Sequence, residues 1–395
     1  MSNNVINQEQ NIKLKKNFKF DTRKYAMFIA LAIIALFFQV LTKGILLKPM
    51  NVTKLILQNS YVLVLAIGMV PCILTGNIDL SVGSIVALVS AISGVCIISM
   101  GLPIGISIVI SLLVGLLVGA WQGFWIAYVK VPAFIVTLAG MLIFRGITMV
   151  ILQGNTLSPY PDIFQYMAMG FLPEFGNENL HLLTIIIGAL ISICFVIYEM
   201  KKRVNAKKYL LEQASKELFI AKLVGVVVVI MFSSFWLARY KGIPIVLIVL
   251  GALVVFYSFV TNKMVIGRHI YALGGNEKAT KLSGIKTKRI MFLVYVNMGL
   301  MAALAGLLFA ARLNAAAPSA GQGFELDAIA ACYIGGASAS GGIGTIVGAI
   351  IGGLVMGILN NGMSLMGIGV DWQQAIKGLV LLIAVAFDIY NRSKK

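Results

Sequence analysis

Asp79 is the residue in this sequence whose setting most strongly suggests chemistry. It lies in the stretch TGNIDLSVGS, residues 75–84, and is the only charged residue between Lys54 and Lys130. A carboxylate near the centre of a bilayer costs about 2.5–3.5 kcal/mol on insertion scales, so a chain keeps one there beside water, a partner or unwound backbone. Asp79 is therefore a candidate for a polar path through a membrane. The alternative is a short turn in which Asp79 or Ser81 caps the next helix.

Short hydrogen-bonding side chains elsewhere in the sequence could line such a path together with Asp79. A neutral, hydroxyl-rich solute is held by hydroxyl and amide groups at a modest affinity that permits release. The candidate residues for this path are Asn77, Asp79, Ser81, Ser84, Thr137, Asn360 and Asn361. For each residue taken singly, hydrogen bonding between helices or helix capping is an equally good explanation.

The sequence lacks the residue patterns of an enzyme or a metalloprotein. It has two histidines and four cysteines, and the cysteines lie in apolar stretches without paired or metal-ligand spacing. The dipeptide Gly-Lys does not occur, so a phosphate-binding loop of the Walker A type is absent from the sequence. We expect no metal site, no disulfide and no cofactor bound by this chain, and any ATP with its Mg²⁺ is expected to be used by a separate protein.

Composition places the chain in a membrane. Of its 395 residues, 59% are hydrophobic and 12% are charged, whereas about a quarter of the residues of a soluble domain are charged. Apolar runs long enough to cross a hydrocarbon core of about 30 Å recur from Tyr25 onward. We predict spans near 25–42, 55–74, 84–100, 103–128, 132–152, 181–199, 220–238, 243–261, 290–311, 343–360 and 374–390, with a shorter apolar piece at 326–337.

The predicted fold is an all-α polytopic membrane protein. The expected number of transmembrane helices is about 10–12, because glycine-interrupted segments can enter a membrane and turn back without crossing it. The expected location is the cytoplasmic membrane, with membrane lipid as the immediate surroundings.

The net charge of +18 follows membrane topology and does not favour a nucleic-acid partner. Of the 32 basic residues, 23 lie in four clusters that flank apolar runs, at 13–24, 201–222, 263–289 and 392–395. The positive-inside rule places these clusters, and both termini with them, in the cytoplasm. The stretch 158–181 has three acidic residues and neither Lys nor Arg, so it is expected to be an outer loop.

This charge pattern predicts one transmembrane domain with small attachments. The domain is expected at 25–390, between cytoplasmic tails at 1–24 and 391–395. Within it we expect the outer loop at 158–181, a cytoplasmic basic insert at 200–222 and a cytoplasmic connecting loop at 263–289.

Two interruptions in the apolar pattern share a layout. Residues 75–84 and residues 334–344, with the sequence IGGASASGGIG, each separate one apolar run from the next. Corresponding interruptions in the two halves of a transporter predict broken or re-entrant helices around a central site. The alternative is that Gly and Ser simply recur in membrane turns. Glycines at four-residue spacing, at 115, 119 and 123 and again at 344, 348 and 352, also predict close helix packing.

Arg145 is a second charged residue within an apolar run, at 141–151. It has no acidic neighbour in sequence, so it must find a partner or extend to water. We expect it near a membrane face, with a structural role.

The stretch GRHIYALGGNEKATKLSG, which ends at Gly284, predicts an organised helix within a connecting loop. Asn276 is a suitable N-cap, Glu277 suits the positive start of a helix, and Gly284 can adopt the left-handed conformation that ends one. Ala279 and Leu282 form a small apolar face. A two-turn helix is not stable alone, so this face is expected to dock on another surface. The alternative is a basic loop whose helix lies on the membrane.

The same stretch closely resembles the cytoplasmic coupling segment of permease subunits of monosaccharide ABC importers, the ribose, xylose, arabinose and galactose class. Other matching stretches cover most of the chain in the expected order, at 75–84, 131–138, 325–330, 334–344 and 359–362. The resemblance implies a type II-like importer permease that is not itself an enzyme. It also implies a second permease copy, a cytoplasmic ABC ATPase and an extracytoplasmic sugar-binding protein as partners.

The resemblance also implies which residues couple the permease to the ATPase. These are Gly267, Arg268, Gly275, Asn276, Glu277, Ala279, Leu282 and Gly284. A region at about 198–261 is additional to the ribose-type pattern and resembles the xylose or multiple-monosaccharide subgroup.

Other functional classes remain open on the sequence. An ion-coupled secondary transporter would use Asp79 as its coupling carboxylate, although its spans would be expected to carry more acidic or histidine residues. A channel or scaffold would need no docking helix. Within the resembling family, a permease for another small solute, such as a branched-chain amino acid, is a further alternative.

Overall fold

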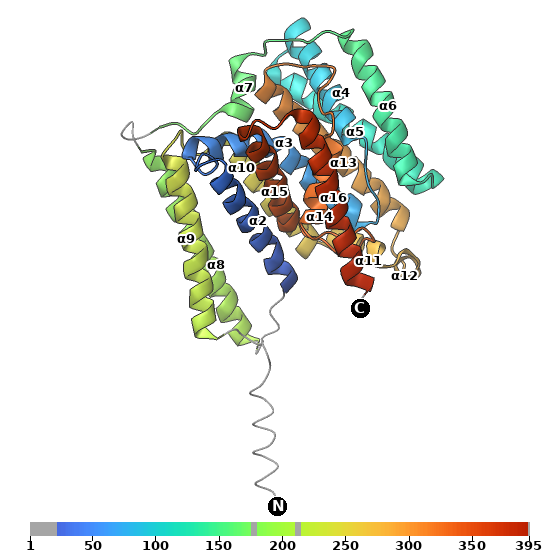
Figure 1. The fold of residues 1–395 in the computed structure, drawn as a ribbon. Coiled ribbons are helices and arrows are strands. Elements are labelled where there is room, and N and C mark those ends of the chain that lie inside the picture. Colours follow the sequence, from blue (N-terminus) through green and yellow to red (C-terminus); the bar gives the residue numbers. More distant parts are fainter. Residues whose placement is uncertain (1–21, 175–179, 210–214, 394–395) are drawn as a thin grey trace, which may run out of the picture.

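A computed structural model describes residues 22–174, 180–209 and 215–393 (Figure 1). The described residues therefore omit nearly all of the predicted 1–24 tail and parts of the predicted outer loop, basic insert and C-terminal tail. Over the described ranges the chain forms helices and turns, with two isolated β-bridges and no strand. The predicted all-α class is confirmed.

The helices follow the predicted apolar runs closely. In chain order they are α2 (Thr22–Leu41), α3 (Pro49–Leu74), α4 (Val82–Gly94), α5 (Ile104–Phe124), α6 (Ala133–Leu152), α7 (Asp162–Met169), α8 (Leu182–Lys208), α9 (Lys216–Ala238), α10 (Ile245–Lys263), α11 (Val265–Gly275), α12 (Glu277–Leu282), α13 (Thr287–Leu313), α14 (Phe324–Ile334), α15 (Ile346–Leu365) and α16 (Val370–Ser393). Two π-helical turns, Val95–Ser99 and Trp125–Val129, extend α4 and α5.

The described helices support a polytopic membrane fold. Nine of them, taken with their π-helical extensions, are long and apolar enough to cross a membrane, and α2 contributes a shorter apolar helix at Met27–Leu41. The twelve predicted apolar runs all correspond to helices. The number of actual crossings stays a prediction.

The bundle has two recognisable ends (Figure 1). At one end, called the α12 end, α3, α5 and α10 finish and α6 and α13 begin. The opposite end is called the α7 end because α7 lies there. At the centre, α13 packs against α3, α4 and α5, and α14 pairs with α15. The α3 residues from Asn59 to Leu74 are buried on nearly all sides, as expected for a helix enclosed by other helices.

Both predicted glycine ladders are places of close helix packing. In α5, Gly115 and Gly119 lie directly against the backbone of α13. In α15, Gly348 lies against the backbone of Gly335, the residue that follows α14. Gly352 lies against the carbonyl oxygen of Ala331 in α14. Side chains at these positions would hold the helices apart, and close backbone approach is what glycine provides where lipid supplies no force between helices.

The two predicted interruptions are non-helical in the structure. Residues 75–81 separate α3 from α4, and residues 335–345 separate α14 from α15. A third non-helical segment, residues 314–323, enters the bundle from the α7 end, and its Gly321 reaches Gly83 at the start of α4. The α14 helix that follows it has 11 residues, about 17 Å, which is too short to cross a membrane.

Candidate functional site

Asp79 anchors the start of α4. Its side chain is fully buried, and its Oδ1 accepts hydrogen bonds from the Ser81 backbone N–H at 2.8 Å and the Ser81 hydroxyl at 2.6 Å. The Ser84 hydroxyl donates to the Ser81 carbonyl oxygen at 2.7 Å. A carboxylate immediately before a helix also suits the positive end of the helix dipole. Through these contacts Asp79 holds Ser81, the residue that immediately precedes α4.

Gln122 of α5 completes this buried cluster and was missed from the sequence. Its Nε2 donates to the Ser81 hydroxyl at 2.6 Å. Gln122 Oε1 and Asp79 Oδ2 are buried without a hydrogen-bond partner among the described residues. The available signal was that Gln122 is the only carboxamide in the predicted span 103–128 and precedes a glycine of the first ladder.

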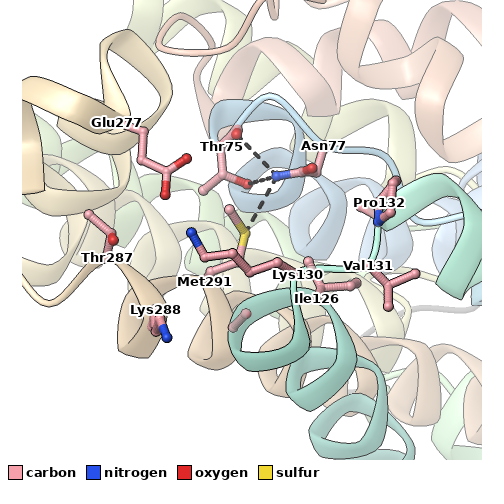
Figure 2. A pocket seen from close by; sticks show the side chains of 12 residues that line it. Thr75, Asn77, Ile126, Lys130, Val131, Pro132, Glu277, Thr287, Lys288 and Met291 are labelled. Carbon is pink, nitrogen blue, oxygen red and sulfur yellow. Dashed lines mark hydrogen bonds between the residues drawn. The ribbon is translucent and has the colours of Figure 1, made fainter.

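A pocket of about 260 Å³ opens beside this anchor at the α12 end (Figure 2). It lies between the first interruption, the α5–α6 turn, the start of α12 and the start of α13. Asn77 reaches into it and donates from Nδ2 to the Thr75 carbonyl oxygen at 3.1 Å. Lys130 and Glu277 line other parts of its wall. A residue predicted for the solute path, Asn77, and one predicted for ATPase coupling, Glu277, therefore share one pocket.

Two of the remaining path candidates, Asn360 and Asn361, lie far from Asp79. Asn361 pairs with Asn51, with an Nδ2 to Oδ1 distance of 2.8 Å. Asn51 is near the start of α3, which is about 39 Å long, and the first interruption follows the other end of α3. Asn361 is thus at the α7 end, and the Oδ1 of neighbouring Asn360 is buried without a partner in the described part of the chain.

Thr137 is a buried residue of α6. Its hydroxyl donates to the carbonyl oxygen of Ala133 at 3.0 Å within the same helix. One turn later, Gly140 lies beside the Gln122 side chain. Thr137 is therefore close to the Asp79 cluster in the fold but is not hydrogen-bonded to it.

Arg145 holds the third non-helical segment. Its Nη1 donates to the carbonyl oxygens of Pro318 at 2.9 Å and Ala320 at 2.6 Å. Seven residues of α6 follow Arg145, so it lies about 10 Å from the end of that helix. The unwound backbone of residues 314–323 offers carbonyl groups that a helix would have used itself, and these supply the partner that Arg145 needs. Its place near a membrane face stays a prediction.

The predicted helix in the 267–284 stretch is present and is capped as expected. Asn276 Oδ1 accepts a hydrogen bond from the Ala279 backbone N–H at 2.9 Å, and Gly284 has a left-handed φ of +82°. Leu282 is 89% exposed and Ala279 is also exposed. The predicted apolar face is therefore exposed in the described part of the chain. Its docking partner stays a prediction.

The other coupling candidates have different surroundings. Gly267 lies against the backbone carbonyl groups at the end of α10, where a Cβ would clash. Arg268 is exposed, and Gly275 has open space where a Cβ would be. Of the two glycines, Gly267 and Gly275, only Gly267 has contacts that require a glycine.

The chain belongs to the family described as the permease component of the branched-chain amino acid transport system, whose model matches residues 51–385. It is 40% identical to a xylose transport system permease protein of Haemophilus influenzae, covering 94% of this chain and 97% of that protein. It is also 40% identical to the corresponding Escherichia coli K12 protein, over 92% and 91%. A ribose import permease protein of Bacillus subtilis is 35% identical, over 95% and 96%.

No solved structure gives a significant match to this chain. The family and the helical bundle together define a membrane permease component of a transport system. The resemblance found in the sequence motifs is thereby confirmed at the level of the family.

Proposed function

We propose that this chain is the membrane-spanning subunit of an ATP-driven importer for a monosaccharide, either a xylose-like pentose or several monosaccharides. The observation that carries the proposal is the capped helix α12, which presents Leu282 to solvent at one end of the bundle and shares a pocket with Asn77. A channel without partners has no need of such a surface. Relatives named for xylose and ribose transport support a sugar as the solute.

The energy source in this proposal lies outside the chain. A cytoplasmic ABC ATPase uses ATP and Mg²⁺ and docks on α12, while this chain binds neither. An exposed leucine on a short, well-capped helix suits an interface better than it suits water, because the exposed apolar side chain is stabilised only when a partner covers it. The segment from Gly267 to Gly284, which contains α12, transmits the movement of the ATPase into the bundle.

We propose that the α12 end faces the cytoplasm. The end of α8, the start of α9 and the stretch from Lys263 to Arg289 all lie at this end, and all are rich in Lys and Arg, as the positive-inside rule requires. The α7 end then faces outward, where an extracytoplasmic sugar-binding protein would deliver the solute. Exposed apolar side chains on α6, such as Leu142, would meet membrane lipid or a second copy of this chain.

In this arrangement Asp79 organises the path by fixing α4 and does not titrate during transport. Asp79→Asn keeps an Oδ1 acceptor for both Ser81 donors, so we expect uptake within about twofold of the unchanged protein. Asp79→Ala removes both hydrogen bonds and leaves buried donors unpaired, so uptake should fall by about tenfold or more. Initial rates of sugar uptake measure both. Equal losses in the two variants would show that the charge itself is required.

Reconstitution tests the function directly. The chain, its ATPase and its binding protein are placed in vesicles, and import of labelled xylose and ribose is followed with and without ATP. Import should require ATP, the ATPase should co-purify, and Leu282→Asp should abolish both co-purification and import because it charges the docking face. Leu282→Met, the matched control, keeps an apolar side chain and should behave like the unchanged protein.

The same vesicles separate the alternatives. Immediate loss of uptake on collapse of the ion gradients, with ATP preserved, would favour an ion-coupled transporter. Downhill sugar flux through the chain without any partner would favour a channel. Import of leucine in place of xylose and ribose would favour the branched-chain amino acid alternative that the family description suggests.

A further inference from the structure

Gly274, in the last turn of α11, lies where two of the non-helical segments meet. The Gly342 backbone N–H, in the segment between α14 and α15, donates to the carbonyl oxygen of Leu74 at the end of α3, at 2.8 Å. A Cβ on Gly274 would overlap the Leu74 carbonyl oxygen and would lie 2.7 Å from the Gly342 nitrogen. Gly274 therefore touches both atoms of the hydrogen bond that joins the two interruptions, and a larger residue has no room there.

Further contacts join α11 to the two interruptions. A Cβ on Gly341, whose φ is +81°, would lie 2.9 Å from the Gly76 nitrogen and 3.0 Å from the carbonyl oxygens of Gly274 and Leu74. One turn earlier on α11, the Tyr271 hydroxyl donates to the Gly344 carbonyl oxygen at 2.7 Å. The end of α11 is thus packed on the beginning of the first interruption and on the end of the second.

The junction is connected to α12 almost directly. Asn276 is the single residue between α11 and α12, and its backbone N–H bonds to the Ala272 carbonyl oxygen at 3.0 Å while its side chain caps α12. A displacement of α12 therefore reaches Gly274 through two residues of chain. Contacts between backbone atoms transmit it with little loss, because no side chain lies between them that could change rotamer.

We propose that Gly274 is a positioning residue through which movement of α12 reaches both non-helical segments at once. The first interruption leads to the Asp79 cluster and the start of α4, and the second leads to the start of α15. One junction would thereby move both broken regions of the bundle together. The inference rests on the proposed function, since it takes α12 as the element that the ATPase moves.

A glycine of α10, outside the coupling segment, provides a matched control. Gly251 has nothing within 4 Å of the position of a Cβ. Gly274→Ala and Gly251→Ala each add one methyl group to a glycine within a helix. Only the first methyl group meets the Leu74 carbonyl oxygen and Gly342.

The experiment measures the number of ATP molecules hydrolysed per sugar imported, in vesicles that contain the permease, its ATPase and its binding protein. For Gly274→Ala we expect normal ATPase co-purification and an ATP-to-sugar ratio raised about tenfold, because the added methyl group disturbs the contact through which the two interruptions are coupled to α12. Gly251→Ala should keep the ratio of the unchanged protein. A purely structural defect would lower ATP hydrolysis and import together and leave the ratio unchanged, which would overturn the proposal.

A second variant, Tyr271→Phe, tests the proposal even if Gly274→Ala does not fold. Tyr271→Phe removes the hydrogen bond to the Gly344 carbonyl oxygen without adding an atom, and the ratio should rise by about threefold, as the loss of about one hydrogen bond allows. An unchanged ratio in Tyr271→Phe would overturn the inference. If the unchanged protein imports sugar without ATP or binds no ATPase, the proposed function itself fails, and that outcome is distinct.

Discussion

The central helices and the α8–α9 hairpin present the same apolar signal in sequence but have opposite surroundings in the fold. In the most apolar window of α3, 78% of the residues are buried within the protein, whereas in α9 the corresponding share is 6%. The α8–α9 hairpin stands beside the bundle in Figure 1. The hairpin contacts the rest of the bundle at the α7 end, where Trp236 Nε1 donates a hydrogen bond to the Leu47 carbonyl oxygen at 2.8 Å.

The difference teaches that apolarity identifies a membrane span without showing whether the span faces protein or lipid. Lipid is as apolar as a leucine side chain, so no hydrophobic force separates the two surroundings. The central helices are distinguished by small and polar residues, such as the glycines of α5 and the serines of α4, whereas α9 consists mostly of Val, Leu, Ile and Phe.

The largest expected contrast between the two regions concerns helix packing. Gly119→Leu in α5 should prevent recovery of folded protein, at a cost above about 3 kcal/mol, because the new side chain meets the backbone of α13 at Tyr295 and Val296. Gly225→Leu in α9 should be tolerated, since Gly225 faces open space. The yield of monodisperse protein and its thermal unfolding midpoint measure both. Similar midpoints for the two variants would remove the packing difference on which the comparison depends.

The second contrast concerns ion pairs. Lys377 of α16 contacts the Asp327 carboxylate of α14 at 3.0 Å, and the Asp327 side chain is 8% exposed. Lys377→Met should cost about 3 kcal/mol because it leaves a buried charge unpaired. Lys222→Met should cost less than about 1 kcal/mol, since Lys222, which pairs with Glu199 at 2.8 Å in the hairpin, is 51% exposed.

Unfolding midpoints in lipid discs test the ion-pair contrast, and a double variant controls it. Adding Asp327→Asn to Lys377→Met removes the unpaired charge and should restore most of the lost stability. A double variant as unstable as the single one would show that Lys377 acts through packing and not through Asp327.

The smallest contrast concerns two arginines. Arg145→Met removes two hydrogen bonds to carbonyl groups of the segment 314–323 and should cost about 2 kcal/mol. Arg239→Met, at the end of α9, should cost less than about 1 kcal/mol, since Arg239 is exposed and its guanidinium lies over the Phe235 ring at 4.7 Å. The same unfolding measurement applies, and equal effects would mean that residues 314–323 do not depend on Arg145 for their conformation.

Local structure was predictable wherever neighbouring residues determine it. The twelve apolar runs are helices, the glycine ladders are close contacts, and α12 begins at the Asn276 cap and is followed by a left-handed Gly284. These features follow from periodicity, from hydrogen bonding over three or four residues and from backbone conformation. The sequence motifs also indicated the family.

Long-range pairing was not predictable from local pattern. Gln122 bonds to Ser81 across 41 residues and Asn51 to Asn361 across 310, so neither pair leaves a periodic signal. Arg145 bonds to backbone carbonyl groups that are 173 and 175 residues away in the chain. The path candidates were grouped by residue type, whereas the fold distributes them between the two ends of α3.

The sequence by itself determined the membrane class, the helices, the two interruptions and the capped helix α12, because each depends on residues close together in the chain. Only the tertiary structure decided that α11 and both interruptions meet at Gly274, that Asn77 and Glu277 share a pocket, and that α9 lies outside the core. The physical reason is that a glycine has no side chain to mark its neighbours. Its contacts exist only where the packing of distant helices brings one backbone against another.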